Sequence, residues 1–329
     1  ARCRTRSVVK LKIKGLGLVI NSQTWHGKKT NSMLSVRVRS LKWEEYQAAF
    51  ILLLPATLGL VIFAFIPIIQ AFWVSFCDAP LLSSQRFPVG LQNYRAALRD
   101  PDFLRSLVNT LSYTVGVVSL QVILALILAL LINNHFPGVG FFRSAYFLPV
   151  VTSLVVVSTV WKIMYHTDNG LINSLLRTFK LPAQPWLTSP RLALFSIILI
   201  GVWKEVGFSM LVLLGGLKNI PNDLYEAADL DGVTAWKTFW LITLPLLRRV
   251  LLFVVVLSTI NAFKIFIPIY VITDGGPANS TQTLVFYVFQ NAFRYFKLGY
   301  ASALSFLLLA LVLVLIAAQF RLLRSDLEY

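Results

Sequence analysis

The sequence predicts an all-α integral membrane protein with six transmembrane helices and a helical loop between the fourth and fifth spans. Three observations carry this prediction. Hydrophobic residues make up 57% of the 329 residues and charged residues only 13%, whereas soluble domains are roughly 25% charged. The mean hydropathy is +0.72. Six apolar segments are each long enough to cross a bilayer, which takes about 20 residues of helix.

The predicted spans lie at about 48–76, 108–132, 142–165, 192–217, 250–272 and 301–322. The first of them contains Pro55 and Pro67. A transmembrane helix tolerates proline because neighbouring helices can satisfy the freed backbone groups. Residues 43–329 are therefore predicted to form one transmembrane domain, with the loop between spans four and five at 218–249.

The distribution of positive charge predicts how the chain is oriented in the membrane. The net charge is +16, and the basic residues gather before residue 43 and at the ends of loops. Cytoplasmic loops are enriched in Lys and Arg, so we expect both the N-terminus and, after six crossings, the C-terminus in the cytoplasm. Loop 218–249 then also faces the cytoplasm. This pattern indicates a lipid bilayer as the partner of the basic residues and excludes nucleic acid.

Residues 1–42 form a basic arm that stands apart from the predicted domain. The segment up to Asn31 has no acidic residue, and the chain does not begin with methionine. The arm either lies on anionic lipid headgroups or is upstream sequence that is not native or is disordered, with the functional protein starting near Met33. It has no apolar core followed by a small-residue cleavage site, so it is not a signal peptide. Cys3 and Cys77 have no disulfide or metal-ligand spacing, and no metal site is expected.

The loop between spans four and five is acidic in a basic chain. It carries four acidic residues within nine positions: Asp223, Glu226, Asp229 and Asp231. An amphipathic helix on a membrane surface is typically basic on its polar face. The acidic character therefore favours a protein partner over the lipid surface.

The same loop is predicted to contain two short helices. Asn219 or Asn222 can cap the first, with Pro221 suited to its first turn. Gly232 ends it, because a residue without a Cβ can adopt the left-handed conformation. The stretch VTAWKTFWLITLP then predicts a second short helix that leads to Pro245 at the start of span five.

Charged residues inside spans four and five are candidates for a substrate pathway. Lys204 and Glu205 follow Trp203 in span four, and Lys264 follows Phe263 in span five. Insertion scales give a cost of about 2.5–3.5 kcal/mol for such a charge at the helix centre, so these groups tend to face a cavity. Lys204 and Glu205 are adjacent and point in different directions, which leaves Lys264 as a possible partner of Glu205. The alternative is a purely structural ion pair with lipid-facing aromatic side chains.

The acidic loop also carries a motif with fixed spacing. Glu226-Ala227-Ala228, Gly232, Ile242 and Leu244-Pro245 resemble the EAA signature of permease subunits of binding-protein-dependent ABC importers. Residues 90–110, 148–176 and 270–293 resemble the carbohydrate branch of these permeases, which contains maltose-type and glycerol-3-phosphate-type importers. Gly275-Gly276-Pro277 and Thr281 in the last stretch point to sugars. The resemblance covers the chain from about Trp43 onward.

The resemblance implies that the loop forms coupling helices that dock on a cytoplasmic ABC ATPase dimer. It assigns this contact to Glu226, Ala227, Ala228, Asp229, Gly232, Ile242, Leu244 and Pro245. ATP and Mg are then expected on the partner ATPase, and no cofactor on this chain, whose nearest approach to a nucleotide loop, HGKKT at 26–30, lacks the first glycine of that motif. The chain is therefore expected not to be an enzyme.

The resemblance further implies a bacterial inner membrane, an extracytoplasmic solute-binding protein, and a second, different permease subunit, although the chain alone does not distinguish a homodimer from a heterodimer. A sugar or a related polyol or glycoside is the expected substrate. The equivalents of spans four and five hold the sugar contacts in maltose-type relatives, which adds Phe208 to the candidates. Glu205 and Lys264 stand where those relatives have small or amide residues. The substrate pathway residues are thus Trp203, Lys204, Glu205, Phe208, Phe263 and Lys264.

The sequence leaves three other functions to compare with import of a sugar. Within the importer class, the substrate could be a compatible solute or a polyol phosphate. A secondary transporter or an ion channel could use the intramembrane charges, but it has no use for the spacing of the acidic loop. A membrane enzyme is disfavoured because His26, His135 and His166 all lie outside the spans and no catalytic pair lies at membrane depth.

Overall fold

The protein is described by a computed structural model that covers residues 43–82, 85–133 and 138–323. The basic arm at 1–42 lies outside the described residues. Contacts divide the chain after Gly59. The part before this division contains most of α1 (Trp43–Leu60), whose described side chains are nearly all exposed and largely apolar. This character suits a helix surrounded by lipid.

The second part begins with a π-helical turn, η1 (Val61–Phe65), and α2 (Ile66–Ser75). Residues Ala49–Ser75 meet the length and hydropathy of a span, as predicted. A second π-helical turn, η2 (Phe239–Thr243), precedes α11 (Leu244–Phe263). Each turn ends two residues before a proline, Pro67 or Pro245. Proline has no N–H and its ring clashes with the carbonyl four residues earlier, so the wider turn accommodates it.

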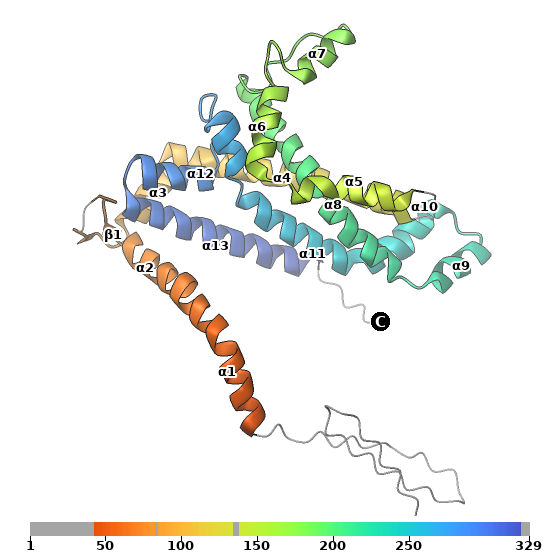
Figure 1. The fold of residues 1–329 in the computed structure, drawn as a ribbon, viewed down its shortest axis with the longest axis horizontal. Coiled ribbons are helices and arrows are strands. Elements are labelled where there is room, and N and C mark those ends of the chain that lie inside the picture. The colour runs from red at the N-terminus through yellow and green to blue at the C-terminus, as the bar shows by residue number, and fades with distance from the viewer. Residues whose placement is uncertain (1–42, 83–84, 134–137, 324–329) are drawn as a thin grey trace, which may run out of the picture. The chain divides into compact units, whose positions relative to one another are not determined.

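Three long helices form the centre of the second part. These are α4 (Pro101–Asn133), α8 (Pro190–Lys218) and α11, which lie against one another in Figure 1. Their shared core is made by Ala125, Ala129, Ile132, Met210, Leu213, Leu217, Leu247 and Val254. α13 (Leu298–Leu323) supplies the last span. Each of these helices overlaps a predicted span.

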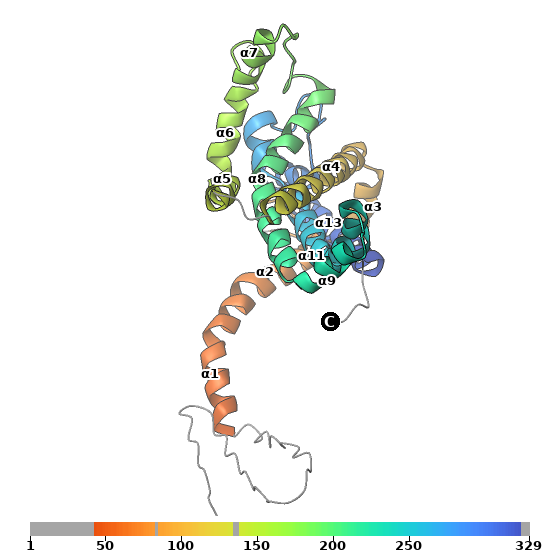
Figure 2. The same ribbon diagram turned by 90° about the vertical axis from the view of Figure 1, so that its right-hand side faces the viewer.

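The third predicted span is not one helix. It consists of α5 (Val139–Val151) and α6 (Leu154–Met164), which meet at 97°, and Figure 2 shows α5 end-on beneath α6. Pro149 lies in the last turn of α5, and Thr152 and Ser153 have extended backbones. The prediction of a continuous helix over 142–165 was therefore wrong, because a proline and two residues outside the helical region interrupt it. Five single helices and this bent pair account for the six predicted spans among the described residues.

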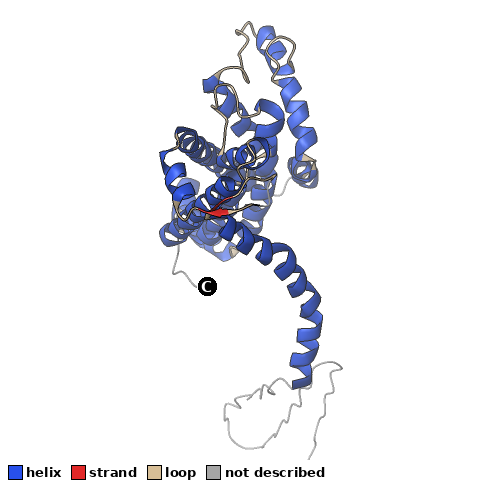
Figure 3. Cartoon of the chain, turned by 90° about the vertical axis from the view of Figure 1, so that its left-hand side faces the viewer, coloured by secondary structure: helices blue, strands red, loops and turns tan. Residues whose placement is uncertain are grey.

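Short elements connect the spans. β1 (Cys77–Asp78) pairs antiparallel with β2 (Phe87–Pro88), with Cys77 opposite Pro88, and Figure 3 shows this pair in red. α3 (Gln92–Arg99) follows, and α7 (Leu171–Thr178) lies between α6 and α8. α12 (Leu284–Phe289) and the π-helical turn η4 (Gln290–Arg294) lie between α11 and α13, after η3 (Ile269–Thr273).

One carboxylate joins three of these elements. Asp100, between α3 and α4, accepts hydrogen bonds from the hydroxyls of Tyr287 in α12 at 2.5 Å and Tyr300 in α13 at 2.7 Å. Burial alone would raise the pKa of Asp100, but the two hydroxyls and the backbone N–H groups of Asp102 and Phe103 outweigh it and hold that pKa below its ordinary value. The ionised carboxylate therefore stabilises the packing of α12 and α13 on α4.

Candidate functional site

The acidic loop forms the helix α9 (Asn222–Leu230). Gly232 has a left-handed φ of +69°. The N–H of Gly232 donates to the Asp229 carbonyl at 3.1 Å, and the N–H of Val233 donates to the Ala228 carbonyl at 2.9 Å. This pair of bonds is a Schellman motif, so the predicted helix end at Gly232 is confirmed. The predicted asparagine cap was wrong: the residue before the helix is Pro221, and no side chain caps it.

Most of the residues of the motif face outward on α9. Glu226, Ala227 and Asp229 are exposed, and only Ala228 turns inward and is buried. A surface with a carboxylate beside a small alanine lets a partner backbone approach closely. The carboxylate of Glu226 has no partner among the described residues of the chain and remains available for a contact with another protein.

The second predicted helix is continuous with span five. α10 (Ala235–Thr238), η2 and α11 follow one another without a break, and Ala235–Phe263 together qualify as one span. Leu244 and Pro245 are the first two residues of α11 and are half-buried, as is Ile242 in η2. The prediction of a separate helix was wrong, because the π-helical turn carries the chain past Pro245 without ending the helix.

A hydrogen bond ties α9 to the start of span five. The Tyr225 hydroxyl lies 3.1 Å from Oγ1 of Thr243 in η2. Tyr225 and Thr243 also line a groove of about 1160 Å³ together with residues of α4 and α8. This contact links α9 to η2, the turn directly before α11.

An aromatic cluster beside α9 was not among the sequence candidates. Trp236, Phe239 and Trp240 contact one another with ring centroids 5.3–6.2 Å apart. Trp236 remains 70% exposed and Leu230, at the end of α9, is 90% exposed. Exposed apolar side chains next to an acidic helix are typical of a protein interface. Their spacing in the sequence could have revealed the cluster.

Inside the bundle, a cavity of about 290 Å³ lies between α4, α8 and α11. Three of the predicted pathway residues line it: Lys204, Glu205 and Lys264. It is also lined by Tyr113, Gln121, Ser258 and Asn261. Hydroxyl, amide and charged groups around a small cavity can hydrogen-bond a polyhydroxylated ligand.

The expected ion pair between Glu205 and Lys264 does not form. Within the described ranges the only ion pair joins Arg294 and Asp274. Lys264 directly follows the last residue of α11, and its side chain is exposed, while Glu205 is half-buried on α8. Both charges therefore line the cavity without neutralising each other.

Lys204 is held by the backbone of the broken third span. Its ammonium donates to the carbonyls of Pro149 and Val150 at 2.7 Å each and of Thr152 at 3.1 Å. The carbonyls at the end of a helix have no partner within the helix, so Lys204 satisfies the end of α5 at the bend. All three protons of the ammonium are used in this way.

A glycine allows this contact. The Cβ of a larger residue at Gly207 would lie 1.9 Å from the carbonyl oxygen of Tyr146 in α5. α5 therefore packs against α8 at backbone distance. Sequence reasoning missed this arrangement, although Gly207 one turn after Lys204 is a signal for close approach of two helices.

The amide of Gln121 is a second polar junction that the sequence did not reveal. Its Nε2 donates to Oγ of Ser209 at 2.7 Å and to Oγ of Ser258 at 3.1 Å. These contacts join α4, α8 and α11 beside the cavity. Buried amides and hydroxyls between spans stabilise helix association in membranes.

The three aromatic candidates lie outside the cavity lining. Trp203 is 40% exposed and contacts Trp161 of α6 with ring centroids 5.6 Å apart. Phe208 is half-buried, and Phe263 is buried in the protein. The structure therefore separates the predicted charged residues, which share a cavity, from the predicted aromatic ones.

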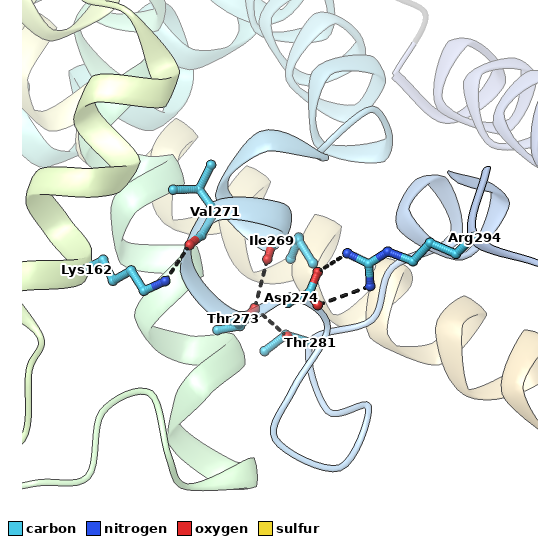
Figure 4. A network of polar contacts seen from close by, with 7 residues as sticks. All are labelled: Lys162, Ile269, Val271, Thr273, Asp274, Thr281 and Arg294. Carbon is cyan, nitrogen blue, oxygen red and sulfur yellow. Dashed lines mark hydrogen bonds and ion pairs between the residues drawn. The ribbon is translucent and has the colours of Figure 1, made fainter. Parts of the chain in front are cut away.

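At the other end of α11, residues 274–283 form a compact loop. The carbonyl of Gly276 accepts a hydrogen bond from Oγ1 of Thr281 at 2.7 Å. Oγ1 of Thr281 also lies 2.8 Å from Oγ1 of Thr273. Figure 4 shows the contact between Thr273 and Thr281 beside the ion pair of Asp274 and Arg294. Thr281 is fully buried. The Gly-Gly-Pro stretch is thus fixed against the end of η3.

Comparison with known proteins decides the class. Residues 94–325 match the family described as "Binding-protein-dependent transport system inner membrane component". This range contains α4 to α13 and the whole acidic loop. The chain belongs to this family. It is a permease, the membrane-spanning component of a transport system, and the prediction of a permease rather than an enzyme is confirmed.

Relatives of the permease agree over most of their length. It is 36% identical over 277 residues to the trehalose/maltose transport system permease protein MalF of Thermococcus litoralis, covering 83% of this chain and 92% of that protein. It is 34% identical over 279 residues to the arabinooligosaccharides transport system permease protein AraP of Bacillus subtilis, covering 84% and 88%. With the lactose transport system permease protein LacF of Rhizobium radiobacter it shares 38% over 237 residues, covering 70% and 79%.

A solved structure shows the same fold. The permease matches a chain in the crystal structure of a bacterial alginate ABC transporter in complex with an alginate pentasaccharide-bound periplasmic protein, with a TM-score of 0.75 and 21% identity. The match covers 85% of this chain and 95% of that chain. The predicted all-α membrane fold is therefore confirmed.

Proposed function

We propose that this permease imports a sugar, or a related polyol or glycoside, that an extracytoplasmic solute-binding protein delivers. The relatives named for trehalose/maltose, arabinooligosaccharides and lactose support a carbohydrate substrate. The cavity between α4, α8 and α11 supports it as well, because Gln121, Asn261 and Glu205 offer the amide and carboxylate groups that bind hydroxyls. Lys204 also lines the cavity, but its ammonium donates to carbonyls at the end of α5 and is not free to bind the ligand.

The energy is proposed to come from a cytoplasmic ABC ATPase dimer that binds α9. The observation that carries this proposal is the exposed Glu226 on a helix that a Schellman motif and the Tyr225–Thr243 contact hold to span five. ATP and Mg belong to the ATPase subunits in this account. Closure of the ATPase dimer would move α9 and the base of α11 as one body, which is the rigid-body motion that alternating access requires.

The assembly contains a second, different permease in this proposal.

The proposal also gives the orientation of the chain in the inner membrane. Both termini and the acidic loop lie in the cytoplasm, and α7 and loop 274–283 lie on the outer side of the inner membrane. The basic residues Arg248 and Arg249 directly before the apolar part of α11 agree with this orientation.

Uptake by the complete transporter in vesicles tests the proposal. Wild-type vesicles loaded with ATP should accumulate at least one of trehalose, maltose, lactose or arabinotriose when the binding protein is outside. Glu226→Lys should abolish uptake and co-purification of the ATPase, whereas Asp168→Lys, on the exposed loop before α7, should leave both unchanged. Uptake that persists in Glu226→Lys would show that α9 is not the docking site.

One observation favours a second candidate substrate. Lys264 lines the cavity as an exposed ammonium that has no carboxylate partner among the described residues, and such a group binds phosphate. A polyol phosphate is therefore the second candidate. Inhibition of sugar uptake by glycerol phosphate, lost in Lys264→Met, would support it.

A further inference from the structure

We infer that a row of aromatic rings beside the Arg294–Asp274 ion pair binds one ring of an oligosaccharide on its way into the cavity. The inference rests on the proposed function and adds a second carbohydrate site to it. The site lies at the end of α11 away from α9, on η3, α12 and η4. Its occupant is an uncharged oligosaccharide of at least two rings.

The rings form a continuous path that starts at the cavity. Phe266 lines the cavity and stacks on Tyr270 with centroids 5.5 Å apart and planes 18° from parallel. Phe289 of α12 packs against both, at 5.0 Å from Phe266 and 5.5 Å from Tyr270. Phe293 of η4 continues the path, 5.4 Å from Phe289. Each step is on the scale of one sugar ring.

The path opens to the surface. Tyr270 is 45% exposed and Phe293 is 58% exposed, while Phe266 and Phe289 are half-buried. The exposed rings present apolar surface on which the C–H groups of a sugar can stack.

Polar groups lie at the edge of the same rings. The guanidinium of Arg294 sits over the rings of Tyr270, Phe286 and Phe289 at 5.5–5.9 Å from their centroids. It binds both carboxylate oxygens of Asp274, at 2.6 and 3.0 Å, as Figure 4 shows. Both side chains are still partly exposed, at 37% and 55%. The remaining N–H groups of Arg294 can donate to the hydroxyls of a sugar, and the remaining lone pairs of Asp274 can accept from them.

The charge of this site selects the class of sugar. Arg294 and Asp274 neutralise each other, so the site has no net charge of its own. A neutral sugar gains hydrogen bonds from both groups, whereas a uronate would have to compete with Asp274 for Arg294. The backbone under the pair is fixed, because Thr273 lies within hydrogen-bonding distance of Thr281 directly beside Asp274.

Saturation-transfer NMR on the purified full chain tests the inference without transport or the ATPase. The probes are maltotriose and arabinotriose, and the detergent carries no sugar headgroup. Wild type should transfer saturation to the C–H protons of one of these probes. Tyr270→Ala with Phe293→Ala should lower the transfer about 3–10-fold. Phe141→Ala, which removes an exposed aromatic ring on α5, is the matched control and should leave the transfer unchanged.

Melting temperatures of the same variants separate binding from folding, since both replaced rings are partly exposed. Asp274→Asn should weaken transfer of a neutral probe, and trigalacturonate should transfer less than maltotriose in wild type. No transfer in wild type, equal transfer in the double variant, or stronger transfer to trigalacturonate would overturn the inference. Sugar uptake that requires Glu226 could still be observed if no sugar binds to the aromatic row. The failure of this inference is therefore distinguishable from the failure of the proposed function.

Discussion

Replacing Lys204 by methionine tests the role of the broken third span. Methionine keeps the length of the side chain but cannot donate a hydrogen bond. The carbonyls of Pro149, Val150 and Thr152 then lose the ammonium that binds them at 2.7, 2.7 and 3.1 Å. They lie at the 97° bend between α5 and α6, where the Pro149 carbonyl keeps hydrogen bonds from the N–H and the hydroxyl of Thr152, at 3.2 and 2.6 Å.

The magnitude follows from two opposing contributions. Hydrogen bonds to a charged group contribute about 1.5–3 kcal/mol each, so three contribute about 4.5–9 kcal/mol. The substitution also removes the cost of holding an ammonium at membrane depth, about 2.5–3.5 kcal/mol. The net destabilisation is therefore about 1–6.5 kcal/mol. Since 1 kcal/mol shifts the melting temperature of a domain this large by about 2–4 °C, a fall of at least about 2 °C is expected.

The assay is thermal unfolding of the purified permease in detergent, together with uptake kinetics of the assembled transporter. Lys162→Met is the matched control: Lys162 is exposed and donates to one carbonyl, that of Val271, at 2.9 Å. This variant loses one hydrogen bond where Lys204→Met loses three, so its melting temperature should fall less. An unchanged melting temperature in Lys204→Met, with a raised KM for the sugar, would refute the reasoning and place Lys204 in the substrate pathway.

Three further predictions concern single contacts. Gly232→Ala should destabilise the end of α9 by about 1–2 kcal/mol, because residue 232 has a left-handed φ. The cost is conformational, since a Cβ at this position meets nothing within 4 Å. Gly232→Asn should retain uptake, and equal uptake in Gly232→Ala and Gly232→Asn would contradict the prediction. Gly207→Ala should displace α5 and lower the melting temperature, whereas Gly215→Ala, where a Cβ has open space, should not; equal melting temperatures would count against the close approach. The pKa of Asp100 is lowered in the folded protein. The stabilisation that the ionised Asp100 gives should therefore be complete above the ordinary pKa of 3.8 and be lost as pH falls through the lower folded pKa. The melting temperatures of wild type and Asp100→Asn should converge at that low pH, and a difference that stays constant with pH would exclude this role.

The spans and the acidic loop could be predicted because their signals are local. Long apolar runs predict the spans, and Gly232 predicts the end of the helix α9 that carries Glu226. The break in span three carried a weaker local signal, Pro149 followed by Thr152 and Ser153. A proline alone did not distinguish a break from a tolerated kink such as that at Pro67.

The contacts of the charged residues could not be predicted from the sequence. Lys204 and Glu205 are neighbours in the chain, but one contacts α5 and the other lines a cavity. The carbonyls that bind Lys204 lie 52–55 residues away in the sequence, and only the packing of α5 against α8 brings them together. The same holds for Arg294 and Asp274, which belong to different elements joined by a folded loop.

We propose that this permease moves sugar when an ATPase acts on α9. The most direct measurement is uptake of trehalose, maltose, lactose and arabinotriose by complete transporters in vesicles, for wild type and Glu226→Lys, with and without ATP. The account predicts ATP-dependent uptake of at least one of these sugars by wild type and none by the variant. Uptake that needs no ATP and follows a proton gradient, or that is equal in both proteins, would contradict it.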